Sequence, residues 1–109
     1  MAKAGLQIEG IIKRYSQQLE KLGLKPEKMI LFGSFAKGMA AEGSDIDLLI
    51  VSEDFQGMNI RERSELLGMA AARILEPIQA EGLTPQEVRE SEDFLEEILQ
   101  SGVVVIERR

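Results

Sequence analysis

The chain has 109 residues, of which 44% are hydrophobic and 29% charged, and its formal net charge is −6. This length is enough for one hydrophobic core, so we expect a single domain over residues 1–109. Cysteine and histidine are both absent, which excludes disulfides, zinc sites and histidine catalysis, and requires that any metal be bound by oxygen. The acidity and the scarcity of aromatic residues argue against an extended nucleic-acid surface.

The first part of the chain predicts a helix and no targeting segment. Residues 1–10 lack the continuous apolar region of a signal peptide, and no segment is long enough to span a membrane. We therefore expect a cytoplasmic protein without a membrane partner. Apolar residues recur at helical spacing from Leu6 to Leu22, and Gly23 supplies a stop.

Two apolar segments, at 28–32 and 46–51, predict strands on either side of a glycine-containing turn. Gly33 and Gly38 lie where a strand ends and where backbone can approach a ligand closely. The uncovered amides there, the hydroxyl of Ser34 and the ammonium of Lys37 are suited to phosphate oxygens. The turn therefore predicts a phosphate-binding site.

Two aspartates precede and enter the second predicted strand. Residues two apart in a strand share a face, so Asp45 and Asp47 place two carboxylates side by side, while Ile46 and Leu48 alternate with them. Close carboxylates repel each other, and a hard divalent cation removes that repulsion. With the phosphate turn, the pair predicts metal-assisted phosphoryl or nucleotidyl transfer.

Each of these residues also has a purely structural explanation. The glycines can shape a tight turn, Ser34 can cap a helix, Lys37 can be a solvated charge, and Asp45 can close a loop. These explanations leave out Asp47, because an acid between two apolar strand residues loses solvation unless it is paired or bound to a metal.

After a polar loop at 52–58, the second half of the chain predicts a helix, a strand, a helix and a strand. Asn59 and Glu62 form a capping box for a helix to Leu75, stopped by Pro77, and a strand follows at 77–83. Thr84 as N-cap, Pro85 in the first turn and Glu87 as the capping-box acid then predict a helix that ends at Gly102. Its expected inner face comprises Val88, Ser91, Leu95, Ile98 and Leu99, and a last strand is expected at 103–106.

This combination of motifs resembles the nucleotidyltransferase superfamily built on the DNA polymerase beta palm, and its minimal nucleotidyltransferase branch in particular. The branch carries a Gly-Ser turn with an aromatic, an alanine, a basic residue and a glycine, followed by Ser-Asp-x-Asp. The resemblance implies an α/β fold with a small mixed sheet flanked by helices, ATP as substrate and Mg²⁺ or Mn²⁺ as metal. The matching residues are Gly33, Ser34, Phe35, Ala36, Lys37, Gly38, Ser44, Asp45 and Asp47.

The third carboxylate is where the chain departs from the family pattern. Active members add an acid from the strand after the long helix, which completes the metal site and accepts the proton of the attacking hydroxyl. Gln79 and Glu81 share a face of that strand. The acid is Glu81 if the register allows it, Glu76 is a weaker candidate, and an alignment with Gln79 at that position leaves no acid.

The small size of the domain implies a partner. The resemblance implies a toxin–antitoxin pair in which the transferase moves AMP from ATP to a hydroxyl of a small helical protein of the HEPN class. Ser44 joins Gly33, Ser34, Lys37 and Gly38 as the expected nucleotide-binding set. A non-catalytic nucleotide-binding or partner-binding antitoxin and a transferase acting on a small hydroxylated molecule are the alternatives, and a homo-oligomer is compatible with the sequence.

Overall fold

The computed structural model describes residues 5–38, 43–91, 95–96, 98, 100 and 102–107. Predictions for residues between these ranges, such as Leu99, fall outside the described residues. The elements are α1 (Gly5–Lys21), β1 (Lys28–Phe32), α2 (Gly33–Ala36), β2 (Ile46–Val51), the 3-10 helix η1 (Glu53–Phe55), α3 (Ile60–Ile74), β3 (Ile78–Leu83), α4 (Pro85–Glu90) and β4 (Val103–Glu107).

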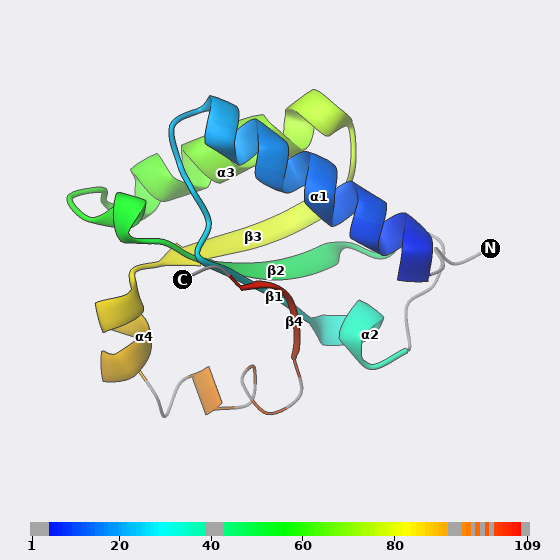
Figure 1. The fold of residues 1–109 in the computed structure, drawn as a ribbon. Coiled ribbons are helices and arrows are strands. Elements are labelled where there is room, and N and C mark those ends of the chain that lie inside the picture. Colours follow the sequence, from blue (N-terminus) through cyan, green and yellow to red (C-terminus); the bar gives the residue numbers. More distant parts are fainter. Residues whose placement is uncertain are drawn as a thin grey trace.

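The strands form one mixed sheet in the order β3-β2-β1-β4. Strand β1 pairs antiparallel with β2 and with β4, whereas β2 and β3 are parallel. Helices α1 and α3 lie on one side of the sheet and α4 on the other (Figure 1). The predicted α/β architecture is confirmed, and α3 is the crossover connection that a parallel pair requires.

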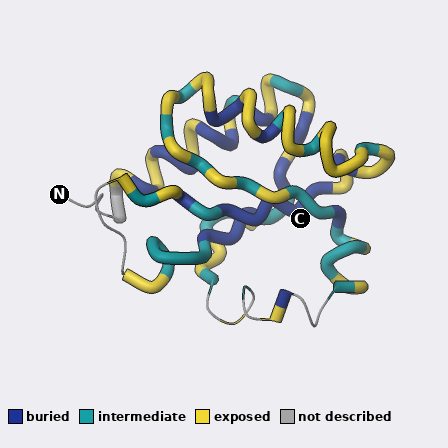
Figure 2. Tube along the Cα trace, turned by 180° about the vertical axis from the view of Figure 1, so that it is seen from behind, coloured by how far each residue is buried: buried dark blue, intermediate teal, exposed yellow. Residues whose placement is uncertain are grey.

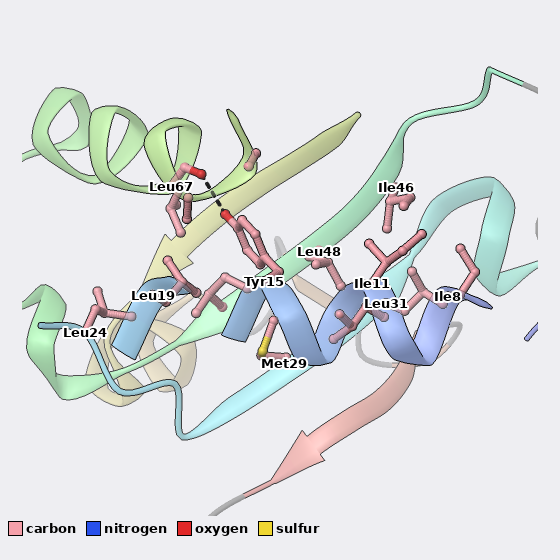
Figure 3. Close-up of a cluster of buried hydrophobic side chains, with 14 of the residues drawn as sticks. Ile8, Ile11, Tyr15, Leu19, Leu24, Met29, Leu31, Ile46, Leu48 and Leu67 are labelled. Carbon is pink, nitrogen blue, oxygen red and sulfur yellow. Dashed lines mark hydrogen bonds between the residues drawn. The ribbon is translucent and has the colours of Figure 1, made fainter. Parts of the chain in front are cut away.

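The larger part of the core fills the space between the sheet and the two long helices. Tyr15 and Leu19 of α1 are fully buried there against Leu48 of β2 (Figure 3). The Tyr15 hydroxyl donates a 2.9 Å hydrogen bond to the carbonyl oxygen of Leu67, which joins α1 to α3. Burial raises the pKa of this phenol well above its ordinary value, because the charged form would lose its hydration.

A smaller cluster occupies the opposite face of the sheet and comprises Ile30, Leu49, Val51 and Leu95. Strands β1 and β2 are therefore covered on both faces, which explains their almost uninterrupted apolar sequences. Figure 2 shows this burial as dark blue in the central strands and yellow on outward-facing parts of the helices. No helix within the described ranges is long and apolar enough to cross a lipid bilayer.

Both predicted capping boxes are present. Asn59 Oδ1 accepts from the amide of Glu62 at 2.8 Å, and the Glu62 carboxylate accepts from the amide of Asn59 at 2.9 Å. Thr84 and Glu87 make the same exchange at the start of α4. Helix α3 ends before the predicted proline stop, because Leu75 takes a left-handed conformation with φ +56° as its C-cap.

Two predictions about loops and helix lengths are corrected. The segment expected as a polar loop at 52–58 contains η1, and Phe55 in it is fully buried. The single helix expected to end at Gly102 is interrupted: α4 ends at Glu90, and Ser91 leaves the helical conformation with φ −109° and ψ +29°. Val88, Leu95 and Ile98 still pack in the same apolar cluster, so the expected inner face holds for these three residues although α4 itself ends at Glu90.

Arg63 of α3 joins three segments around β3. Its guanidinium donates to the Glu87 carboxylate at 2.6 Å and to the carbonyl oxygens of Gly82 at 3.0 Å and Phe55 at 3.1 Å. It also lies 5.4 Å from the centre of the Phe55 ring, within cation–π range. The hydrogen bond from Arg63, with those from Thr84, holds the pKa of Glu87 below its ordinary value.

Candidate nucleotide and metal site

The predicted phosphate turn begins directly at the end of β1. Gly33 is the first residue of α2, and the amide of Lys37 donates to the Gly33 carbonyl oxygen at 3.1 Å, which closes the turn. Gly33 has φ +74°, and a side-chain Cβ added to it would overlap Asp47 Oδ2 and lie 3.1 Å from Asp47 Cγ. Glycine is therefore required both by the backbone conformation and by the close approach of the carboxylate.

Asp47 comes to this turn from the neighbouring strand. It pairs with Phe32 in the antiparallel register of β1 and β2, so the strand places it beside Gly33. Ile46 and Leu48, on either side of it in the sequence, point to the opposite face and are fully buried in the larger core. The sequence prediction that this aspartate stands opposite to its apolar neighbours and meets the turn is confirmed.

The electrostatics of Asp47 are those of a carboxylate close to other carboxylates. Its pKa is raised above the ordinary value, first by burial and then by the negative charges of Asp45 and Glu81. Asp45 itself precedes β2 and is exposed. A cation bound here would offset both the desolvation and the repulsion, and carboxylate oxygens with phosphate and water are the ligands that Mg²⁺ prefers.

The register of β3 decides where the third acid lies. Gln79 is directly opposite Asp47, whereas Glu81 is opposite Leu49, one step further along the same face. Glu81 nevertheless lies close enough for its charge to raise the pKa of Asp47. The part of the chain that the structure describes has no group of three or more acidic side chains arranged to hold an ion together.

The weaker candidate for the third acid is engaged elsewhere. The Glu76 carboxylate accepts a 3.4 Å hydrogen bond from Arg14 of α1, as part of an ion pair between the two side chains. Glu76 also precedes β3 and is not in its paired register with β2. Of the two acids considered, Glu81 is the one whose charge acts on Asp47.

The remaining predicted nucleotide-binding residues lie in α2, directly after it, and just before β2. Ser34 is half-buried inside α2, and the helix is capped by Phe32 without a side-chain hydrogen bond, so the alternative of Ser34 as N-cap is wrong. Lys37 and Gly38 are exposed directly after α2, and Ser44 is half-buried just before Asp45. Residues 39–42, which connect the two parts, lie outside the described residues.

One residue near the site was not singled out from the sequence. Arg63 holds the carbonyl oxygen of Gly82, the neighbour of Glu81, and so fixes the end of β3. Its partners Gly82 and Glu87 lie 19 and 24 positions away along the chain, so no local spacing indicated the contact. Arg63 is a positioning residue for this strand, with no contact to the aspartates.

The comparison with known families agrees with this geometry. The family model of the nucleotidyltransferase domain matches residues 12–108. The chain belongs to the nucleotidyltransferase domain family. No curated protein matches the sequence.

Two solved structures share the nucleotidyltransferase fold with this chain. One is a toxin–antitoxin complex with AMP-PNP, with a TM-score of 0.66 and 20% sequence identity over 93% of this chain and 74% of the other. The second is a nucleotidyltransferase, so described on similarity, from Sulfolobus solfataricus, with a TM-score of 0.55 and 22% identity over 95% and 89% of the two chains. At these identities the likeness shows a shared fold alone.

Proposed function

We propose that this nucleotidyltransferase domain transfers AMP from ATP to a hydroxyl group of a HEPN-type partner, as the antitoxin of a toxin–antitoxin pair. The observation that carries the proposal is the packing of the Asp47 carboxylate against Gly33 at the start of the phosphate turn. A solved relative of the same fold is a toxin–antitoxin complex containing AMP-PNP, which supports a protein partner and an adenine nucleotide. The HEPN class rests on the sequence resemblance.

The residues divide the work between binding and proton transfer. The backbone of Gly33 and Gly38, with Ser34, Lys37 and Ser44, binds and orients the triphosphate. Asp45 and Asp47 would hold Mg²⁺ or Mn²⁺, and the bound metal would neutralise phosphate charge and polarise the reacting phosphoryl group.

Transfer forms a bond between the acceptor oxygen and the α-phosphorus and breaks the bond to the β-phosphate, so that pyrophosphate leaves. Glu81 accepts the proton of the acceptor hydroxyl in this scheme. Its position on the same face as Asp47 supports this role, as does the rise that its charge causes in the pKa of Asp47.

Calorimetry of ATP binding tests the metal site. We expect Mg²⁺ to promote binding, and we expect Asp47→Ala and Asp45→Ala each to reduce it strongly, because each change removes a metal ligand and leaves the phosphate turn. Glu90→Ala, which removes an exposed carboxylate from α4, is the matched control and should bind as the parent does. Binding that is independent of metal and unaltered in both aspartate variants would overturn the assignment.

Intact-mass spectrometry with the cognate partner tests the chemistry. The parent protein with ATP and Mg²⁺ should add AMP to the partner, and Asp47→Ala should not. Glu81→Gln should keep metal–nucleotide binding and slow transfer by roughly a hundredfold or more, because the amide cannot accept the proton. Transfer by Glu81→Gln at the parent rate would remove the base assignment alone.

The second candidate is an antitoxin that binds nucleotide or partner without catalysis. The observation in its favour is that Gln79, an amide, occupies the position directly opposite Asp47. It becomes the better account if the parent protein adds no AMP to its genuine partner although Mg²⁺-dependent ATP binding is intact.

A further inference from the structure

A groove runs between α1 and the outer strand β4, on the face of the sheet that α1 and α3 cover. It encloses about 780 Å³ and is lined by one side of α1, including Ser16 and Gln17, and by the whole of β4. Asp47 lies on the opposite face, with Leu49 and the smaller apolar cluster. The groove is therefore separate from the candidate nucleotide site.

The floor of the groove is an apolar edge strand. In the described part of the sheet β4 pairs with β1 on one side and has no strand on the other (red in Figure 1). Val103 and Val104 remain 47% and 49% exposed. An edge strand of this kind offers backbone amides and carbonyls to another strand, and apolar side chains that such a strand can cover.

The wall of the groove contains a buried hydroxyl group without a partner. Ser16 is 2% exposed, and its Oγ is a buried side-chain atom for which the described residues supply no hydrogen bond. Buried polar groups in folded proteins are normally hydrogen-bonded, and leaving one unpaired is unfavourable. Since Ser16 lines the groove, an occupant of the groove can provide the missing hydrogen bond.

The charge of the lining distinguishes between occupants. Its ionisable side chains are three carboxylates, on Glu9, Glu20 and Glu107, and one ammonium, on Lys13. Glu107 is paired with Lys28 of β1 at 3.2 Å, with both side chains partly exposed. A second copy of this chain would bring two such acidic linings together, whereas a basic segment would meet charges of opposite sign.

We propose that the groove between α1 and β4 binds an extended basic segment of a partner protein, which pairs with β4 as an additional strand. Apolar side chains on one face of the segment cover Val104, and on the groove face its lysine or arginine residues lie beside Val103 and reach Glu9 and Glu20, while a polar group reaches Ser16. Main-chain pairing supplies affinity and the side chains supply selectivity, as in other cases of strand addition. The proposal goes beyond the proposed transferase activity and does not depend on it.

A pair of synthetic peptides tests the proposal on the intact protein. The probe is a capped heptapeptide of alternating lysine and valine, and the matched peptide has glutamate in place of lysine. In ¹H–¹⁵N spectra at 150 mM salt, the lysine peptide should shift amides of β4 and of the groove side of α1, and the glutamate peptide should not. Equal binding of both peptides, binding of neither, or shifts centred on another face would each overturn the proposal.

Charge variants separate the groove from general attraction between a basic peptide and an acidic protein. Glu9→Lys and Glu90→Lys change the net charge equally, but Glu9 lines the groove and Glu90 lies on α4. Glu9→Lys should weaken binding of the lysine peptide by about fivefold, the size of one exposed charge contact. Glu90→Lys should leave the affinity for this peptide nearly unchanged. Equal weakening in both variants would overturn the proposal.

Variants at Ser16 and Val103 test the contacts themselves. Ser16→Ala should weaken binding of the peptide by about fivefold without lowering the free energy of unfolding of the free protein, because the described residues give this hydroxyl no hydrogen bond to lose. Val103→Lys should abolish peptide binding and leave Mg²⁺–ATP binding intact. Sedimentation that shows a dimer of the parent, lost in Val103→Lys, would assign the groove to a second copy and overturn the proposal.

Peptide binding and ATP binding, measured separately, distinguish this proposal from the proposed transferase activity. Asp47→Ala should leave peptide binding unchanged, because Asp47 lies on the other face of the sheet. A parent protein that binds the peptide but not Mg²⁺–ATP would count against the nucleotide site alone. The reverse result would count against the groove alone.

Discussion

Replacing Gly33 by alanine tests the contact between the phosphate turn and Asp47. Two effects add in Gly33→Ala. A non-glycine residue at φ +74° costs about 1–2 kcal/mol, and relief of the overlap between its Cβ and Asp47 Oδ2 costs about 1–3 kcal/mol more, as for other overpacked sites. We therefore expect the free energy of unfolding in urea to fall by about 2–5 kcal/mol, and Mg²⁺–ATP binding to weaken because Asp47 is displaced.

The control for the backbone effect is Gly57→Ala. Gly57 has φ +82°, and a Cβ there would meet nothing within 4 Å, so only the first cost of about 1–2 kcal/mol applies. A double-mutant cycle isolates the second cost: in the Asp47→Ala background Oδ2 is gone, and Gly33→Ala should cost no more than Gly57→Ala. Equal losses of stability for Gly33→Ala and Gly57→Ala in the parent background, with ATP binding unaltered in both, would refute the reasoning.

Four further predictions concern stability and protonation. Tyr15→Phe should lower the free energy of unfolding by about 1 kcal/mol in urea, because it leaves the α3 carbonyl without its donor, and an unchanged value would contradict the contact. Arg63→Lys should destabilise the protein, because an ammonium cannot bond to the same set of acceptors. The folded-state pKa of Glu87 lies below its ordinary value of 4.5. The stability that its pair with Arg63 contributes should therefore be complete above pH 4.5 and lost as the pH falls through the folded-state pKa. Urea titrations of Glu87→Gln should lack this loss. Glu81→Gln should lower the pKa of Asp47 measured by NMR, since it removes one of the negative charges that raise it, and an unchanged pKa would place Glu81 out of reach.

The sequence was most informative where local chemistry decides the structure. The strands at 28–32 and 46–51 have the predicted bounds, because apolar residues there are buried on both faces of the sheet. The capping boxes of α3 and α4 were predictable for a similar reason, since each depends on two side chains three residues apart. The approach of Asp47 to the glycine turn followed from the order strand, turn, strand and from the period of two in β2.

Features that depend on distant contacts could not be predicted in the same way. The sequence placed Gln79 and Glu81 on one face but left open which of them is opposite Asp47, because the register of a parallel pair is set by how α3 packs across the sheet. The end of α4 at Glu90 and the burial of Phe55 in η1 also depend on tertiary packing. The sequence pattern alone predicts a continuous helix that ends at Gly102 and a polar loop at 52–58.

The parallel crossover from β2 to β3 divides the candidate site between two parts of the chain that are far apart in the sequence. The glycine turn and Asp47 come from adjacent strands within a local hairpin-like unit, whereas Glu81 arrives only after α3 has returned the chain to the sheet. Under the proposed function, a substitution of Glu81 would slow proton transfer and leave in place the residues proposed to bind the nucleotide and its metal. Strand β3 would then separate transfer from binding, and it is the strand in which the amide of Gln79 lies opposite Asp47.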